Sequence, residues 1–208
     1  MRVSNLYNLL APIYGRITPA MFDRLNLRAV QRLSAGGPQS ILEVAVGPGR
    51  LLERLSAKQG EKARVIGVDM APAMLKEARQ HLEKSLGSAR LVQADGLHLP
   101  FASGRFDAAV ATFFLDVLPQ EDLQPALAEL TRAVAPGGRV ILGSFRINNS
   151  LLRQGWMMTY NIIPDLVGRI RPIEIDQYLA DLGLRVLRDE EVPDFTGVRM
   201  LTLLKATG

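Results

Sequence analysis

The sequence predicts an α/β protein with a doubly wound, mostly parallel sheet of seven strands that ends in a C-terminal antiparallel hairpin. From residue 40 to residue 145, short runs rich in β-branched residues alternate with amphipathic stretches, a pattern typical of βαβ units. The first run ends in glycines that lead directly into a helix, and open α/β sheets bind ligands at such places. Two later apolar runs are separated by a turn-rich segment, which favours the hairpin.

The elements follow in order along the chain. Five parallel strands are expected at residues 40–46, 64–69, 89–94, 106–111 and 139–145. Leucine, alanine or valine recurs every three to four residues in three predicted helices, at 50–59, 73–86 and 124–133. The tripeptide Pro136-Gly137-Gly138 cannot continue a helix, so we expect it to form the turn into the fifth strand.

The alternation stops after the fifth strand. Residues 148–171 contain several aromatic residues and methionines and end in basic residues, which predicts an inserted helix or lid. A short helix at 175–182 and two hairpin strands at 184–192 and 199–206 should follow.

Composition excludes several classes of protein. The 208 residues are 48% hydrophobic and 22% charged, as in an ordinary one-domain globular protein. No run approaches the roughly 18 apolar residues of a membrane-spanning helix. The chain has no cysteine, which excludes disulfides and thiolate sites, and its two histidines argue against a metal centre. No secretory signal is visible in residues 1–15, so we expect a cytoplasmic protein.

The basic charge is concentrated at the N-terminus. Residues 1–40 carry five arginines against one aspartate, which accounts for the whole net charge of +4. Such a patch suits an anionic membrane surface or a phosphate group, but it also suits a solvated helix face. Both interpretations stay open.

The first strand and the loop after it contain the pattern Glu43-x-Ala45-x-Gly47-x-Gly49. The second strand ends in Asp69, twenty residues beyond Gly49, where nucleotide-binding sheets place an acid on the ribose hydroxyls. Capping of the next helix by Asp69 is the less favoured alternative. A nicotinamide-dependent oxidoreductase is an alternative, although Leu52 stands where its third glycine would be.

This spacing resembles motif I of the class I S-adenosylmethionine-dependent methyltransferases. Four more segments, at 67–75, 93–107, 111–115 and 136–138, resemble the later motifs of that family in the same order. The resemblance covers most of the chain. It implies a Rossmann-like fold, S-adenosyl-L-methionine as cofactor, S-adenosyl-L-homocysteine as product and a small-molecule acceptor.

The resemblance also assigns roles to residues. Glu43 would orient the methionine amino group, Asp69 would hold the ribose, and Met70 would flank the adenine. The edge of the adenine would be recognised by Asp95 and Leu97. The other residues expected around the cofactor are Ala45, Gly47, Gly49, Gly96 and Thr112.

Ala45 departs from the family pattern, which usually has a glycine at this position. If its φ is positive, the alanine is strained there, and cofactor binding is weakened.

The segment from Tyr7 to Tyr14 resembles Y-x-x-x-A-x-x-Y, which precedes the core of ubiquinone/menaquinone-biosynthesis and bacterial phospholipid N-methyltransferases. It implies a helical lid whose two tyrosines approach the cofactor, although both tyrosines could instead be core anchors. We therefore divide the single domain into an N-terminal helical lid, a cofactor-binding core, a lid insertion with its helix, and a hairpin, at residues 1–37, 38–146, 147–183 and 184–208.

Methyl transfer from a sulfonium needs chiefly an aligned nucleophile and the exclusion of water. Asp116, Tyr14 and Tyr160 are the candidates for contact with the acceptor, and Asp116 could equally be a capping acid.

The insertion places aromatic residues and methionines beside four arginines, a combination that an anionic lipid interface attracts. We therefore expect a lipophilic acceptor approached from a membrane surface, such as an aminophospholipid or a prenylated quinone. A soluble metabolite, or a silent binding protein with this fold, are the alternatives. The quinone-pathway segment N-P-P-D is absent, and so is the N/D-P-P-Y/F tetrapeptide of enzymes that methylate bases, which argues against nucleic acid.

Overall fold

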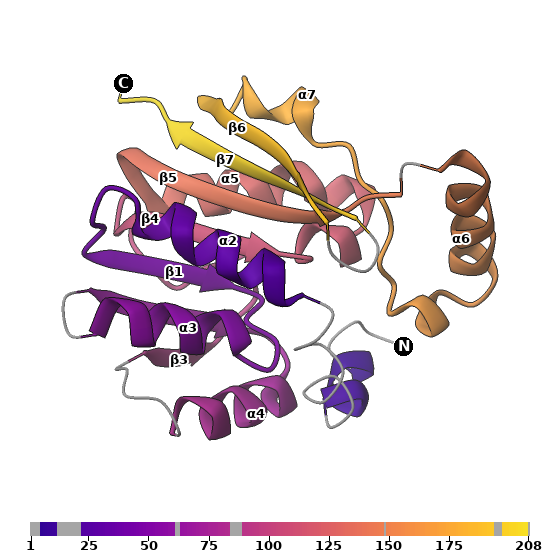
Figure 1. The fold of residues 1–208 in the computed structure, drawn as a ribbon, viewed down its shortest axis with the longest axis horizontal. Helices are drawn as coiled ribbons and strands as arrows, with labels where there is room; N and C mark the ends of the chain where they lie inside the picture. The colour runs from indigo at the N-terminus through magenta and orange to yellow at the C-terminus, as the bar shows by residue number, and fades with distance from the viewer. Residues whose placement is uncertain are drawn as a thin grey trace.

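The computed structural model describes residues 5–11, 22–60, 63–83, 89–147, 149–193 and 197–207. Its centre is one seven-stranded sheet with the order β3-β2-β1-β4-β5-β7-β6 (Figure 1). The strands are β1 (Ser40–Val44), β2 (Arg64–Asp69), β3 (Arg90–Gln93), β4 (Phe106–Thr112), β5 (Val134–Phe145), β6 (Leu184–Val192) and β7 (Val198–Lys205). The first five strands are parallel, and β7 pairs antiparallel with both β5 and β6. The predicted fold class and hairpin are confirmed.

Helices cover both faces of this sheet. They are α2 (Asp23–Ser34), α3 (Arg50–Gln59), α4 (Pro72–Leu82), α5 (Leu123–Ala133), α6 (Ser150–Ile162) and α7 (Asp176–Leu179), with short 3-10 helices η2 (Leu115–Val117), η3 (Gln120–Asp122) and η4 (Pro164–Val167). Residues 5–11 are also helical. Buried side chains of α2, α3 and α4 pack on one face, and those of α5 and α7 pack on the other.

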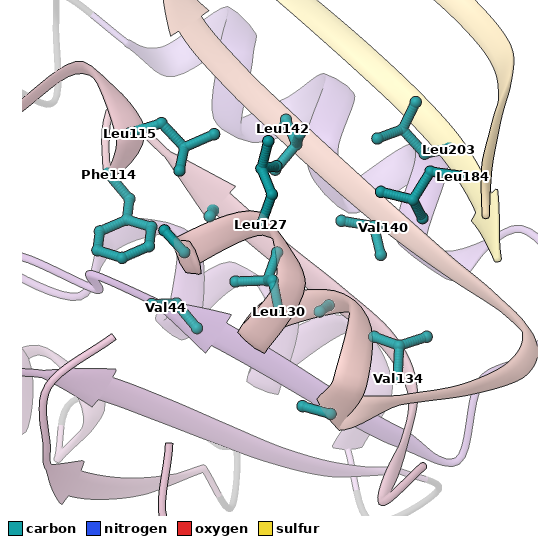
Figure 2. Close-up of a cluster of buried hydrophobic side chains, with 14 of the residues drawn as sticks. Val44, Phe114, Leu115, Leu127, Leu130, Val134, Val140, Leu142, Leu184 and Leu203 are labelled. Carbon is teal, nitrogen blue, oxygen red and sulfur yellow. The ribbon is translucent and has the colours of Figure 1, made fainter. Parts of the chain in front are cut away.

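The core follows from the alternation of side chains along each strand. In β1, Ile41 faces the cluster that contains α2 and α3, whereas Leu42 and Val44 face the cluster that contains α5. Figure 2 shows the second cluster, where Leu127 and Leu130 of α5 lie over the sheet. Strands buried on both faces are continuously apolar, which is why the parallel strands were visible in the sequence.

Two strand boundaries differ from the prediction by two residues or more. β1 ends at Val44 rather than at residue 46, because Ala45 has a φ of 59° and leaves the extended region. β5 begins at Val134 rather than at residue 139. The register with β4 passes from Phe106–Val134 to Ala108–Arg139, so the predicted Pro136-Gly137-Gly138 turn lies inside the strand as an irregularity.

Two helices are shorter than expected. α4 ends at Leu82, and residues 84–86 of the predicted helix lie outside the described residues. α7 spans only Asp176–Leu179, and the chain then turns at Gly183, whose φ is 65°. Within the described residues, no helix has the length and apolar character needed to cross a bilayer.

Candidate functional site

A cavity of about 560 Å³ lies where β1, β2 and β4 end. The neighbours of β1 on its two sides are β2 and β4, so this is the point at which the strand order reverses, the usual ligand site of such sheets. Ten of the predicted cofactor residues line the cavity: Tyr7, Glu43, Ala45, Gly47, Asp69, Met70, Asp95, Gly96, Leu97 and Thr112. Tyr14 lies outside the described residues.

The loop between β1 and α3 is built from left-handed residues. Ala45, Gly47 and Gly49 have φ values of 59°, 52° and 81°. A Cβ added to Gly47 would meet no atom within 4 Å, so this glycine serves the backbone conformation. A Cβ on Gly49 would lie 2.7 Å from the Cβ of Ala78 and 2.8 Å from its Cα. Gly49 is therefore needed for the close approach of the loop to α4, behind the cavity wall.

Ala45 adopts the same left-handed conformation although it is not a glycine. An L-residue in the left-handed region is destabilised by about 1–2 kcal/mol. The sequence predicts strain at Ala45 if its φ is positive, and the structure meets this condition. Such strain is commonly found beside ligand sites, where the surrounding structure holds it.

Asp69 connects the glycine loop to β2. Its Oδ2 accepts a hydrogen bond from the Gly47 amide at 2.8 Å, and its Oδ1 accepts one from the Ala71 amide at 2.9 Å. Burial raises the pKa of this carboxyl, and hydrogen bonds from the Ala71, Gly47 and Met70 amides oppose the rise. Each oxygen can accept a further hydrogen bond. Asp69 can thus orient the loop and also bind a pair of hydroxyl groups.

Glu43 is a buried acid that lines the cavity. The Oε2 atom of this side chain has no hydrogen-bond partner among the described residues. Burial, and secondarily the negative charge of Asp69, raise the pKa of Glu43 well above its usual value. A buried carboxyl with a free oxygen is costly unless a ligand completes it. The acids of this cavity fit a ligand that carries an amino group, a sulfonium and ribose hydroxyls.

Asp95 lines the cavity just after β3. Its Oδ1 accepts a hydrogen bond from the Leu97 amide at 2.9 Å, which fixes this turn. A Cβ on Gly96 would lie 2.4 Å from the ring of Phe114, so a larger residue would displace that ring. The partly exposed Met70 lies on the same cavity wall. These groups suit a planar base with one polar edge.

The N-terminal segment closes one side of the cavity. Tyr7 donates from its hydroxyl to the carbonyl of Gly168 at 3.0 Å, which joins residues 5–11 to the insertion. The side chain of Asn8 accepts from the amide of Ala73, in the first turn of α4. Residues 5–11 therefore lie between the insertion and α4.

Two predicted catalytic residues lie elsewhere. Asp116 in η2 is fully buried and accepts from the Phe145 amide at 2.7 Å, so it joins the ends of β4 and β5 and does not line the cavity. Burial raises its pKa to about 7. Tyr160 lies on α6, also away from the cavity wall. Neither side chain lines this cavity, and their contact with an acceptor stays a prediction.

The cavity also contains residues that the sequence did not indicate. Arg50 begins α3 directly after the glycine loop, and this position could have identified it. Phe113 and Phe114 lie in the segment 111–115 that resembles a family motif, although no role was assigned to them. The other cavity residues lie outside the motifs and carry no local signal. They are Phe22, Asn26, Val117, Leu118, Pro119, Asp122, Arg169 and Ile170.

Comparison with known proteins agrees with this geometry. A family model described as a methyltransferase domain matches residues 41–138. A demethylmenaquinone methyltransferase of Desulfitobacterium hafniense is 29% identical over 199 residues, which cover 91% of this chain and 78% of that protein. A ubiquinone/menaquinone biosynthesis C-methyltransferase of Syntrophotalea carbinolica is 32% identical over 184 residues, covering 82% and 76%.

The fold is shared with solved structures at lower identity. The magnesium protoporphyrin IX methyltransferase of Synechocystis, solved with bound S-adenosylhomocysteine, superimposes with a TM-score of 0.71 and 21% identity. The match covers 88% of this chain and 82% of that structure.

Proposed function

This chain belongs to the class I S-adenosylmethionine-dependent methyltransferases, and from that premise we propose that its methyl acceptor is a lipophilic, quinone-like molecule. The observation that carries the proposal is the group of apolar side chains in the cavity wall. Beyond the residues assigned to the cofactor, the wall includes the apolar Phe22, Phe113, Val117, Leu118 and Ile170, beside the polar Asn26, Asp122 and Arg169. Aromatic and aliphatic walls of this kind bind ring systems and prenyl chains. The quinone enzymes among its relatives support the same acceptor class.

The cofactor residues follow from the cavity. We assign Glu43 to the amino group of the cofactor, Asp69 to its ribose, and Asp95 with Met70 to its adenine. S-adenosylmethionine, when bound, supplies a methyl group activated on sulfur. A cationic ligand next to Glu43 favours the ionised carboxylate, so binding returns the pKa of this acid toward its usual value.

The remaining task of the chain is alignment. A hydroquinone ring carbon is made nucleophilic by its own hydroxyl group, so it needs to be held behind the methyl group in a dry site. Bound S-adenosylmethionine would give up its methyl group and be left as a neutral thioether. The proton displaced from the ring carbon would pass to solvent, so one proton would be released for each methyl group transferred. The apolar walls exclude water, and Arg169 and Ile170 of the insertion complete the wall.

The test is an acceptor panel with cofactor labelled in its methyl group. The panel contains a prenylated demethylnaphthoquinol, phosphatidylethanolamine in detergent, and water-soluble phenols and amines. We expect label in the naphthoquinol. Label in the phosphatidylethanolamine would replace the quinone-like acceptor by an aminophospholipid, and label confined to an aqueous product would refute a lipophilic acceptor. Asp69→Ala serves as the control, because it should abolish labelling of every acceptor.

A further inference from the structure

We propose that α6 and the segment that follows it dock the protein on an anionic phospholipid bilayer, with the cavity opening toward the lipid. The inference rests on the proposed function only in that a lipophilic acceptor would reach the cavity from the membrane. Three observations support it: the exposed apolar side chains of α6, the excess of arginines around this helix, and the contacts of α6 with the segment that lines the cavity.

α6 has an unpartnered apolar face. Leu151, Met158 and Ile162 are 75%, 64% and 73% exposed. They recur at spacings of seven and four residues, which places them on one face of the helix. No residue of α6 is buried, and Figure 1 shows the helix standing away from the sheet. We call these three side chains the α6 stripe.

The apolar exposure is concentrated around the cavity. Ten large apolar side chains are exposed among the described residues, and seven of them come from α6 and its end, from Leu9, or from Met70. Leu9 is in the same helical segment as Tyr7, which lines the cavity, and Met70 lines it directly. Both α6 and residues 5–11 lie beyond the carboxyl ends of the parallel strands (Figure 1). One face of the molecule therefore combines the cavity with the apolar side chains.

The charge of this region fits anionic headgroups. Residues 146–174 contain four arginines and two acids, an excess of two positive charges. Arg169 pairs with Asp165, and Arg153 lies 3.9 Å from Glu174. Arg171 donates to the carbonyl of Leu118 and the side-chain amide of Gln120, both neutral groups. Apolar side chains enter the acyl boundary of a bilayer while nearby cations meet phosphate groups. A second copy of this chain would bring the same excess of positive charge to the contact, which disfavours it as the occupant.

Two of the N-terminal arginines, Arg24 and Arg32, lie at the hairpin. Arg32 of α2 forms a two-fold hydrogen-bonded ion pair with Glu190 on β6, at 3.0 and 3.1 Å. Arg24 donates to the carbonyl of Pro193, at the end of β6. Both are thus engaged at the hairpin, and the insertion is the better candidate for membrane contact.

A hydrogen bond joins α6 to the segment that lines the cavity, and a ring contact joins it to β5. The indole nitrogen of Trp156 donates to the carbonyl of Ile170 at 2.9 Å, and the indole ring lies 4.7 Å from the ring of Phe145. Ile170 lines the cavity, and the next amide, of Arg171, donates to the carbonyl of Asp116. A bilayer held by the α6 stripe would therefore lie next to the wall through which an acceptor enters.

The experiment measures binding of the whole chain to vesicles of phosphatidylcholine, with and without phosphatidylglycerol. The test variant carries Leu151→Gln, Met158→Gln and Ile162→Gln. The matched control carries Val186→Gln and Leu187→Gln, two exposed apolar residues on β6. We expect wild type and control to bind anionic vesicles alike, the stripe variant to bind at least tenfold more weakly, and added salt to weaken binding.

A second readout separates this inference from the proposed function. With a prenylated quinol in detergent, the stripe variant should keep activity within twofold of wild type, whereas with the quinol in anionic vesicles it should lose most of it. Vesicle binding equal to wild type would overturn the docking surface and leave the acceptor class standing. A change from dimer to monomer on sedimentation of the stripe variant would overturn it too, because a second copy would then be the occupant.

Discussion

At the scale of single residues, the two acids Asp69 and Glu43 of the cavity differ in how their carboxyl oxygens are hydrogen-bonded. Asp69 is satisfied by backbone amides, whereas Glu43 keeps one buried oxygen without a partner among the described residues. Asp69 therefore shapes the site before a ligand arrives, and Glu43 gains a partner only with the ligand. The strained Ala45 lies two residues beyond Glu43, in the loop that Asp69 holds.

Ala45→Gly should stabilise the protein. The substitution removes a left-handed penalty of about 1–2 kcal/mol, and the greater freedom of glycine in the unfolded chain offsets part of this gain. We expect a net gain of about 0.5–1 kcal/mol, with equal or tighter cofactor binding. Thermal unfolding and calorimetry would measure both.

The control for this change is Ala57→Gly, at an exposed position in α3, where glycine costs about 1 kcal/mol. The two glycines should shift the melting temperature in opposite directions. A similar loss in both variants would show that Ala45 is not strained.

Glu43 should make cofactor binding depend on pH. Its pKa is raised in the free protein, and a cationic ligand lowers it, so binding releases a proton below the raised pKa. Affinity should thus increase with pH and level off above that pKa. Glu43→Gln should weaken binding at least tenfold, about 1.4 kcal/mol, and flatten this dependence. Titration calorimetry in two buffers of different ionisation enthalpy would count the protons, and an unchanged count in the variant would contradict the role.

At the scale of elements, the site depends on how closely the glycine loop approaches α4 and on how the ends of β4 and β5 are held together. Gly49 controls the first of these, through its contact with Ala78. Asp116 controls the second, through the Phe145 amide. Both residues act from behind the cavity.

Gly47→Ala should mainly lower cofactor affinity, whereas Gly49→Ala should mainly lower the stability of the fold. Both introduce a left-handed alanine, but only Gly49→Ala also places a Cβ against the backbone of α4. We expect Gly49→Ala to cost about 1–3 kcal/mol more in the free energy of unfolding. Gly47→Ala should act mainly on cofactor affinity, because Gly47 lines the cavity. Denaturant unfolding of both variants would compare them, and equal losses would refute the packing role of Gly49.

Asp116 should make stability fall between pH 4 and pH 7. The folded-state pKa is raised from 3.8 to about 7, so the folded protein binds the proton more tightly than the unfolded chain. The stabilisation is complete below pH 4, is lost as pH rises toward 7, and changes no further above that. The expected loss is on the order of 4 kcal/mol. Asp116→Asn keeps an acceptor for the Phe145 amide and removes the titration.

Glu43 and Asp69 contribute a slope of the same sign, so the comparison is between wild type and Asp116→Asn at each pH. The difference in unfolding free energy should grow in favour of the variant up to pH 7. Parallel curves would mean that Asp116 does not titrate in this range.

The sequence predicted the order and type of the elements because continuous apolar runs and three-to-four-residue spacing are local signals. It misplaced the end of β1 and the start of β5 because both depend on pairing with neighbouring strands. The loop residues from Glu43 to Gly49 were found by a short motif. Phe22 and Arg169 were not found, because only the tertiary fold brings them to the cavity. The residues next to Asp116 in the sequence likewise do not indicate that it is buried.

At the scale of the whole molecule, a well-packed sheet carries a loosely attached helix. α5 has six buried residues, whereas α6 has none. The N-terminus of α6 is capped by Asn149, whose side chain accepts hydrogen bonds from the Leu151 and Leu152 amides. Its stability must therefore come mostly from local hydrogen bonds rather than from packing.

Hydrogen exchange should reflect this contrast. Local opening costs least where few apolar contacts are buried, so amides of α6 should exchange much faster than those of α5. Cofactor should protect residues near Glu43, Asp69 and Asp95 and leave α6 unchanged, whereas anionic vesicles should protect α6. Mass spectrometry of peptides would resolve these segments, and protection of α6 equal to that of α5 in free protein would contradict the expectation.

The position of β7 has a consequence for biosynthesis. β7 follows β6 along the chain, yet it lies between β5 and β6 and pairs with both. Until residues 198–205 have left the ribosome, the nascent sheet presents the twelve-residue β5 with an open edge, the kind of edge that recruits other chains. Assembly therefore depends on a late, long-range pairing, and substitutions that delay β7 should lower the yield of soluble enzyme before they affect the finished fold.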